Sequence, residues 1–138
     1  MAQTPHELVN PDTLAPPSGY AHAVVAASGR LVFLGGQVAH DADGVCRGET
    51  LVEQFELALE NVVTALRAAG GAPEHLVSVQ IFVTDVAAYR ASTRELGDRY
   101  RRVVGRHFPA MALLEVAGLF DPAALVELVC VAVVPEAA

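Results

Sequence analysis

The segment from Leu125 to Val134 constrains the fold of this 138-residue chain more than any other part of it. It reads Leu-Val-Glu-Leu-Val-Cys-Val-Ala-Val-Val, so it is rich in strand-forming residues and apolar at nearly every position. A strand that is apolar on both faces must be covered on both faces. Its one charged residue, Glu127, is costly to bury without a partner. We therefore expect one of two things. Either Glu127 lies near a strand end, facing solvent or pairing with an arginine, or it is a pocket carboxylate that performs acid–base chemistry.

Hydrophobic periodicity and turn residues divide the rest of the chain into strands and helices. The predicted strands cover residues 20–27, 31–37, 76–84, 110–116 and 125–134, and the predicted helices cover residues 50–69 and 85–105. A tight turn at Ser28-Gly29 is expected to pair the first two strands. Thr50 and Glu53 fit a capping box at the start of the first helix. Residues 1–17 are polar and rich in proline, which predicts an irregular N-terminal arm on a single domain that spans residues 1–138.

The resulting order, β-β-α-β-α-β-β, predicts an α+β fold in which the two helices pack on one face of a mixed sheet. Each helix is expected to cross over between strands that are parallel neighbours or near neighbours. The opposite face still carries apolar side chains, notably those of the final strand. Apolar residues make up 53% of the chain, above the roughly 45–50% that is typical of soluble domains. We therefore expect the open face to be buried against other copies of the chain.

Composition also excludes several classes of function. A net charge of −7 disfavours nucleic-acid binding, which depends on contacts between basic side chains and phosphates. No apolar run approaches the ~20 residues of a membrane span, and no signal-peptide pattern is present, so a cytoplasmic protein is expected. The cysteines lack a partner motif and the histidines lack metal-ligand spacing. No metal and no cofactor are therefore expected.

Several segments, taken in order, resemble the RidA/YjgF family, whose members are also called L-PSP endoribonuclease-like proteins. They are residues 19–24 (Gly-Tyr-Ala-His-Ala-Val), 35–38 (Gly-Gly-Gln-Val), 54–61 with 66–70, 82–85 (Phe-Val-Thr-Asp), and the ending from Phe108-Pro109-Ala110 through Val133. The resemblance runs from about residue 10 to residue 134. It implies a chorismate-mutase-like fold, a homotrimer, and a pocket for a small-molecule metabolite at each subunit interface.

The resemblance also implies the residues of that pocket. Family members with deaminase activity hydrolyse reactive enamines and imines to a keto acid and ammonia. In them a glutamate on the last strand helps to activate water, and a tyrosine in the Gly-Tyr segment lines the pocket. These positions correspond to Glu127 and Tyr20 as catalytic candidates. The substrate-binding candidates are Gly35, Gly36, Met111 and Leu113.

Met111 is the main departure from the family pattern, because an arginine at this position holds the substrate carboxylate in the deaminases. A charge-assisted bond from arginine contributes roughly 1.5–3 kcal/mol, whereas methionine has no donor and can only pack. Either the ligand has no carboxylate at this point, or another arginine reaches the pocket. The candidates for that second case are Arg47, Arg101, Arg102 and Arg106.

Two functions remain as alternatives. The first is an enzyme that performs acid–base or hydrolytic chemistry on a reactive imine, enamine or related metabolite. In this case Glu127 moves protons or positions water, and Tyr20 orients the ligand. The second is a non-catalytic trimer that binds a small ligand. RNA cleavage, suggested by the older family label, is disfavoured by the acidity of the chain.

Overall fold

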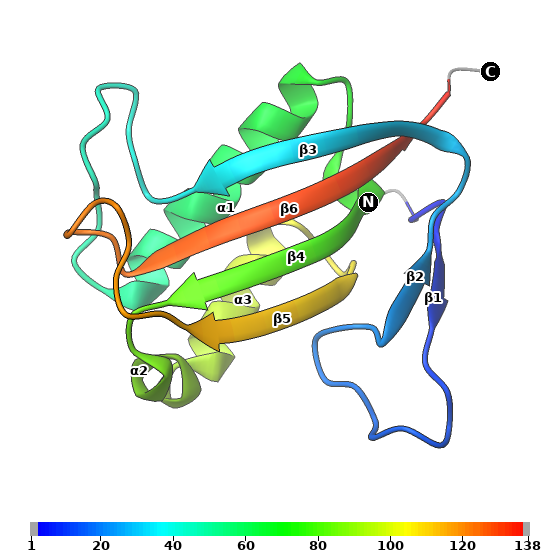
Figure 1. Ribbon diagram of the computed structural model, residues 1–138, viewed down its shortest axis with the longest axis horizontal. Coiled ribbons are helices and arrows are strands. Elements are labelled where there is room, and N and C mark those ends of the chain that lie inside the picture. The colour runs from blue at the N-terminus through cyan, green and yellow to red at the C-terminus, as the bar shows by residue number, and fades with distance from the viewer. Residues whose placement is uncertain (1–2, 137–138) are drawn as a thin grey trace.

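The computed structural model describes residues 3–136, which form a four-stranded mixed sheet, a separate two-stranded ribbon and a layer of helices (Figure 1). The sheet contains, in spatial order, β3 (Gly29–Gln37), β6 (Val126–Pro135), β4 (Leu76–Val83) and β5 (Ala110–Glu115). The ribbon pairs β1 (Glu7–Val9) with β2 (Ala23–Val25). The helices are α1 (Leu51–Ala68), the short 3-10 helix η1 (Pro73–His75), α2 (Val86–Ala91) and α3 (Thr93–Val103). The predicted α+β fold is confirmed.

The final strand, β6, lies between β3 and β4 and runs antiparallel to both. Packing on its inner face explains the apolar residues at alternate positions from Val126 to Val134, whereas the apolar residues between them face the open side of the sheet. The strands β4 and β5 are parallel and are joined through α2 and α3. The helix α1 joins β3 to β4, which are parallel strands with β6 between them. The predicted helical crossovers between parallel neighbours or near neighbours are therefore present.

The first helix begins where the capping residues predict. The Thr50 hydroxyl accepts a hydrogen bond from the Glu53 backbone N–H at 3.2 Å. The Glu53 carboxylate reaches back one residue further than expected and accepts from the Glu49 N–H at 2.8 Å. The predicted apolar face of α1 is buried in the core, and its members are Phe55, Leu59, Val62 and Leu66.

The first predicted strand is wrong in length and in partner. Only Ala23–Val25 forms a strand, and it pairs with β1 in the N-terminal arm instead of with β3. The arm supplies polar partners for this segment, because Asn10 accepts from the His22 N–H at 2.8 Å and the His22 ring donates to the Ala15 carbonyl at 2.7 Å. The arm is therefore less irregular than its prolines predict, although its first two residues lie outside the described part of the chain.

The second predicted helix is divided at Ser92, where φ is −120° and ψ is 16°. The shorter piece, α2, begins at the predicted cap, since the Asp85 carboxylate accepts from the Ala88 N–H at 3.1 Å. Apolar periodicity does not reveal the break, because Tyr89 before it and Leu96 after it both belong to the core side.

The two faces of the sheet differ in what covers them. Figure 1 shows the helices behind one face, and the alternate β6 residues from Val126 to Val134 are buried there. On the other face Phe33 is 74% exposed and Leu31 is 63% exposed. This open apolar face is the one that the sequence predicts to be covered by other copies. No helix among residues 3–136 combines the length and apolarity required to cross a membrane.

Candidate functional site

Three of the predicted site residues, Tyr20, Met111 and Leu113, line one hollow of about 280 Å³ at the β5 edge of the sheet. The segment that carries Tyr20 is tied to the start of β5, because the Ala21 N–H donates to the Pro109 carbonyl at 3.0 Å. Gly19 precedes it with φ of +74°, a conformation that favours glycine. The Gly-Tyr segment and the segment after Pro109 therefore form one wall.

Buried hydrogen bonds hold the start of β5 in place. The Tyr100 hydroxyl donates to the His107 carbonyl at 2.6 Å, and the His107 ring nitrogen Nε2 donates to the Leu76 carbonyl at 2.7 Å. The rings of Tyr100 and Phe108 stack with centroids 5.3 Å apart. Burial raises the pKa of Tyr100 and lowers the pKa of His107. The phenol therefore stays a donor, and the imidazole is kept neutral.

The other predicted site residues, Glu127, Gly36 and Gly35, lie together on a different part of the molecule. A Cβ added to Gly36 would lie 2.9 Å from the carboxyl carbon of Glu127, so this carboxylate lies directly over the glycine. The pairing of β3 with β6 shifts register between Leu34 and Gln37, where the two glycines occur. The glycine pair therefore lies at a bulge in β3, and the Glu127 side chain approaches Gly36 closely.

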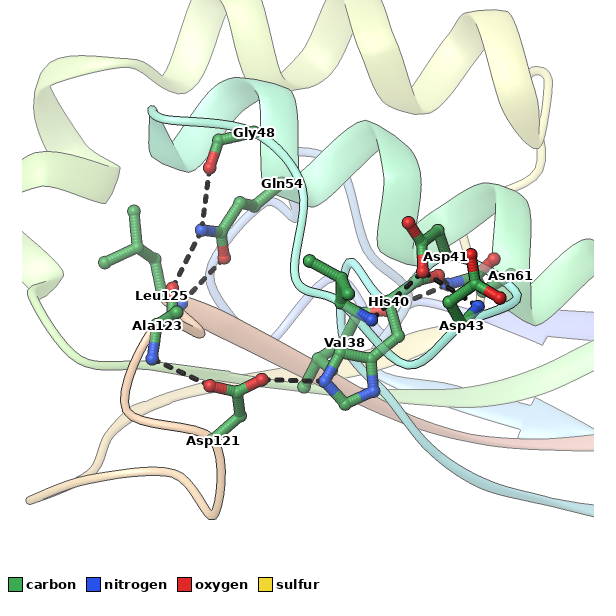
Figure 2. Close-up of polar contacts among 11 residues, drawn as sticks. Val38, His40, Asp41, Asp43, Gly48, Gln54, Asn61, Asp121, Ala123 and Leu125 are labelled. Carbon is green, nitrogen blue, oxygen red and sulfur yellow. Dashed lines mark hydrogen bonds and ion pairs between the residues drawn. The ribbon is translucent and has the colours of Figure 1, made fainter.

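The loop before Glu127 is fixed by the buried amide of Gln54, which projects from α1. Its Nε2 donates to the carbonyls of Gly48 at 3.1 Å and Ala123 at 3.0 Å, and its Oε1 accepts from the Leu125 N–H at 2.8 Å. Figure 2 shows this amide between the two loops. Gln54 is 2% exposed, so all of these bonds are shielded from water.

A second set of bonds fixes the loop after Gly36. The Asn61 amide donates to the carbonyls of Val38 and His40, both at 2.9 Å. The His40 ring donates to the Asp121 carboxylate at 2.8 Å, and this bond lowers the pKa of Asp121 (Figure 2). The loops that follow Gly36 and precede Glu127 are thereby joined.

Sequence reasoning did not assign these anchoring roles to Gln54 and Asn61. Two amide side chains seven positions apart share one side of a helix, close to the apolar face of α1. A polar side chain next to the buried face of a helix needs hydrogen-bond partners. An amide at such a position is therefore the sequence signal that could have identified both anchoring residues.

A single protomer does not bring all predicted site residues together. Strand register puts Met111 in one row with Val79 and Cys130, which are buried on the helix side. Glu127 falls in another row, opposite Phe82, on the open side. Met111 and Glu127 therefore project from opposite faces of the sheet, because side chains alternate along each strand. Each half of the predicted site is incomplete without the other.

Within residues 3–136, no group of three or more His, Cys, Asp or Glu side chains is placed to hold a metal ion. Among the titratable groups near the two halves, Tyr100 and His107 are engaged in protein hydrogen bonds, and Glu127 lies on the open face. The arrangement offers a carboxylate on one side and an aromatic, largely apolar hollow on the other.

The profile of the family described as Endoribonuclease L-PSP matches residues 11–134, nearly the whole chain. The chain belongs to this family. The RidA/YjgF resemblance of the sequence segments is thus confirmed. Among L-PSP relatives, the RutC family protein UK114 of Drosophila melanogaster is 34% identical over 120 residues, covering 85% of this chain and 80% of that protein. Protein mmf2, mitochondrial, of Schizosaccharomyces pombe is 35% identical over 102 residues, covering 74% of this chain and 75% of that protein.

Solved L-PSP-type structures share the fold. The conserved Rid family protein YyfB of Yersinia pestis superposes with a TM-score of 0.84 at 29% identity, covering 94% of this chain and 98% of its own. Rv2704 of Mycobacterium tuberculosis, a member of the YjgF/YER057c/UK114 family, gives a TM-score of 0.64 at 27% identity, covering 94% and 99%.

Proposed function

We propose that this chain is a RidA-type enzyme that hydrolyses a small reactive imine, enamine or related metabolite in a cleft between protomers of a homotrimer. The observation that carries the proposal is the division of the site. Glu127 lies over Gly36 on the open face, whereas Tyr20 and Met111 line a hollow at the β5 edge. One protomer supplies the carboxylate and its neighbour supplies the hollow.

The open face supports this assembly. The exposed Phe33 and Leu31 lie on the same face of the sheet as Glu127, and exposed apolar side chains grouped in this way indicate a protein interface. Burial of this face against a second copy would enclose Glu127 at the same time. A carboxylate held at a closed interface is shielded from bulk water, which strengthens its interactions with a bound substrate.

The proposed reaction converts an imine and one water molecule to a carbonyl compound and ammonia. Glu127 accepts a proton from water as the water oxygen forms a bond to the imine carbon, and Glu127 then delivers this proton to the imine nitrogen. A second proton transfer from the new hydroxyl to nitrogen accompanies cleavage of the C–N bond, so ammonia leaves and the carbonyl forms. The Tyr20 hydroxyl orients the substrate. Such positioned acid–base groups contribute about 10²–10⁴-fold to a rate.

Met111 bears on the choice of substrate. A methionine offers no donor for a carboxylate next to the C=N bond, and its side chain packs against the core. We propose that the substrate has no carboxylate directly beside the reacting carbon. Imines derived from 2-amino acids are then poor substrates, and imines without a carboxylate on the reacting carbon are better ones.

The first test measures ammonia released from imines that an amine oxidase generates in situ. Glu127→Gln is expected to lower this rate by about 10²-fold or more. The matched control is Glu60→Gln, which changes an exposed carboxylate on α1. Equal rates in wild type and Glu127→Gln would contradict the proposal. Binding without ammonia release in wild type would instead support the alternative, a non-catalytic trimer that binds small ligands.

The second test asks whether two protomers share each site. Tyr20→Ala and Glu127→Gln chains are unfolded, mixed in equal amounts and refolded together. About a quarter of the interfaces in a random mixture would join an intact Tyr20 hollow to an intact Glu127. Activity should therefore rise well above that of either variant alone. No recovery in mixed trimers would show that both residues act within one protomer or that neither is needed.

A further inference from the structure

A second cavity of about 370 Å³ adjoins the Tyr20–Met111 hollow, and it extends from β5 under α2 and α3. The two share Met111, Ile81 and Tyr89 in their walls, so they are parts of one elongated cleft. The second cavity is lined by aromatic and aliphatic side chains, including Phe55, Leu96, Tyr100 and Phe108, and also by polar groups such as Thr93. This lining suits an apolar or aromatic body.

One charged residue, Arg101, lines this cleft among the residues that the structure describes. Arg101 lines the second cavity, which does not border Tyr20. Its guanidinium lies across Gly97, where an added Cβ would be 3.2 Å from Nη1. The missing side chain at Gly97 therefore provides the space that the guanidinium occupies at the cleft wall.

Asp98 uses only part of the hydrogen-bonding capacity of this arginine. The Arg101 Nη2 donates to the Asp98 carboxylate, and a guanidinium has five N–H donors. The remaining donors are free to bind a second acceptor. Because Asp98 offsets part of the positive charge, the site favours a single negative charge over a doubly charged group such as a phosphate.

The other arginines considered as replacements for the missing family arginine lie elsewhere. Arg102 pairs with Glu56 at 3.0 Å and lines a different hollow, which Arg101 also borders, and Arg47 pairs with Asp41 at 2.8 Å. Arg106 is exposed and is not among the residues that line the cleft. Only Arg101 shares a cavity with Met111.

We propose that this cleft binds a monocarboxylate with an apolar or aromatic body. The carboxylate binds Arg101, and the body fills the space between α3 and β5 as far as Met111. This assignment rests on the proposed function, and it places the reacting imine beside Tyr20, at the end of the cleft opposite Arg101. The substrate class is then a carboxylate separated from its C=N group by an apolar body, in contrast to a 2-imino acid, in which the two groups are adjacent.

The experiment measures binding of 3-phenylpropionate and of its neutral amide to the assembled full-length protein by titration calorimetry. The acid is expected to bind about tenfold or more tightly than the amide. Arg101→Gln should remove this preference and leave binding of the amide unchanged. Arg102→Gln, the matched control, should retain the preference.

Three results would overturn the inference: no binding of 3-phenylpropionate, equal affinity for acid and amide, or the same loss in Arg101→Gln and Arg102→Gln. If Glu127→Gln keeps full ammonia release while the acid still depends on Arg101, the proposed function fails and this inference stands. If Glu127 is essential but the acid binds without Arg101, this inference alone fails.

Discussion

The carboxylate of Glu127 occupies the space in which a side chain at Gly36 would lie. An added Cβ would be 2.9 Å from the Glu127 carboxyl carbon, which is closer than nonbonded carbon atoms approach in proteins. The two residues belong to the antiparallel neighbours β6 and β3. The glycine therefore determines where the carboxylate lies on the open face of the sheet.

Gly36→Ala should displace the Glu127 carboxylate and lower ammonia release while changing stability little. Only the end of a flexible side chain has to move, so we expect a change of about 0.5 kcal/mol or less in the free energy of unfolding. Steady-state kinetics and urea denaturation measure the two effects. Gly118→Ala is the control, since an added Cβ there meets nothing within 4 Å. An unchanged rate in Gly36→Ala would show that the carboxylate position does not matter.

Met111→Arg should destabilise the protein by about 1–3 kcal/mol, because it places a guanidinium against the apolar core. The same change restores a donor for a carboxylate beside the C=N bond, so ammonia release from imines of amino acids should increase. Thermal denaturation and an assay coupled to an amino-acid oxidase measure the two outcomes. Met111→Leu conserves volume and should cost less than about 1.5 kcal/mol without new activity. Equal activity of both variants would contradict the interpretation.

Phe33→Glu should prevent assembly without unfolding the protomer. Phe33 is 74% exposed on the open face, and a carboxylate there would have to be desolvated at an interface between copies. Sedimentation velocity should show a trimer for wild type and a smaller species for the variant, with unchanged circular dichroism. Leu14→Glu, at a half-exposed position in the N-terminal arm, is the control. A wild-type monomer would contradict the proposed assembly.

Stability should fall as the pH is lowered below about 6.5, the ordinary pKa of histidine, because burial lowers the pKa of His107. The unfolded chain then binds a proton that the folded chain does not, which costs up to about 1.4 kcal/mol for each pH unit over this range. At higher pH both states are neutral, and the contribution of His107 to the pH dependence disappears. Urea denaturation between pH 5 and 8 measures the slope.

His107→Gln should reduce this slope, since glutamine can still donate to the Leu76 carbonyl but does not titrate. A slope that is the same in wild type and His107→Gln would assign the pH dependence to another group.

Local patterns in the sequence were sufficient for the elements whose residues interact mainly with near neighbours. The helix α1 begins at Thr50 as its cap predicts, and its apolar spacing identifies the buried face. The apolarity of β6 likewise predicts a strand that must be covered on both faces and an open sheet face that still carries apolar side chains. These features depend on residue spacing along one segment, which can be read without knowing the fold.

Contacts between distant segments depended on the tertiary structure. The pairing of β2 with the N-terminal arm depends on hydrogen bonds such as that from the His22 N–H to Asn10. The spacing of residues within the strand does not predict these bonds. Gln54 is similar, because it joins residues that lie up to 71 positions away. Such contacts form only when the fold brings distant segments together, so the local spacing of apolar residues does not predict them.

The sequence by itself determined the family, the α+β fold and the identity of the groups in the candidate site, including methionine in place of arginine at position 111. The tertiary structure alone decided that Met111 and Glu127 project from opposite faces of the sheet and that Arg101 shares a cavity with Met111. The physical reason is strand register. A shift of one residue moves every side chain to the other face, and register is set by pairing between strands that are remote in the sequence.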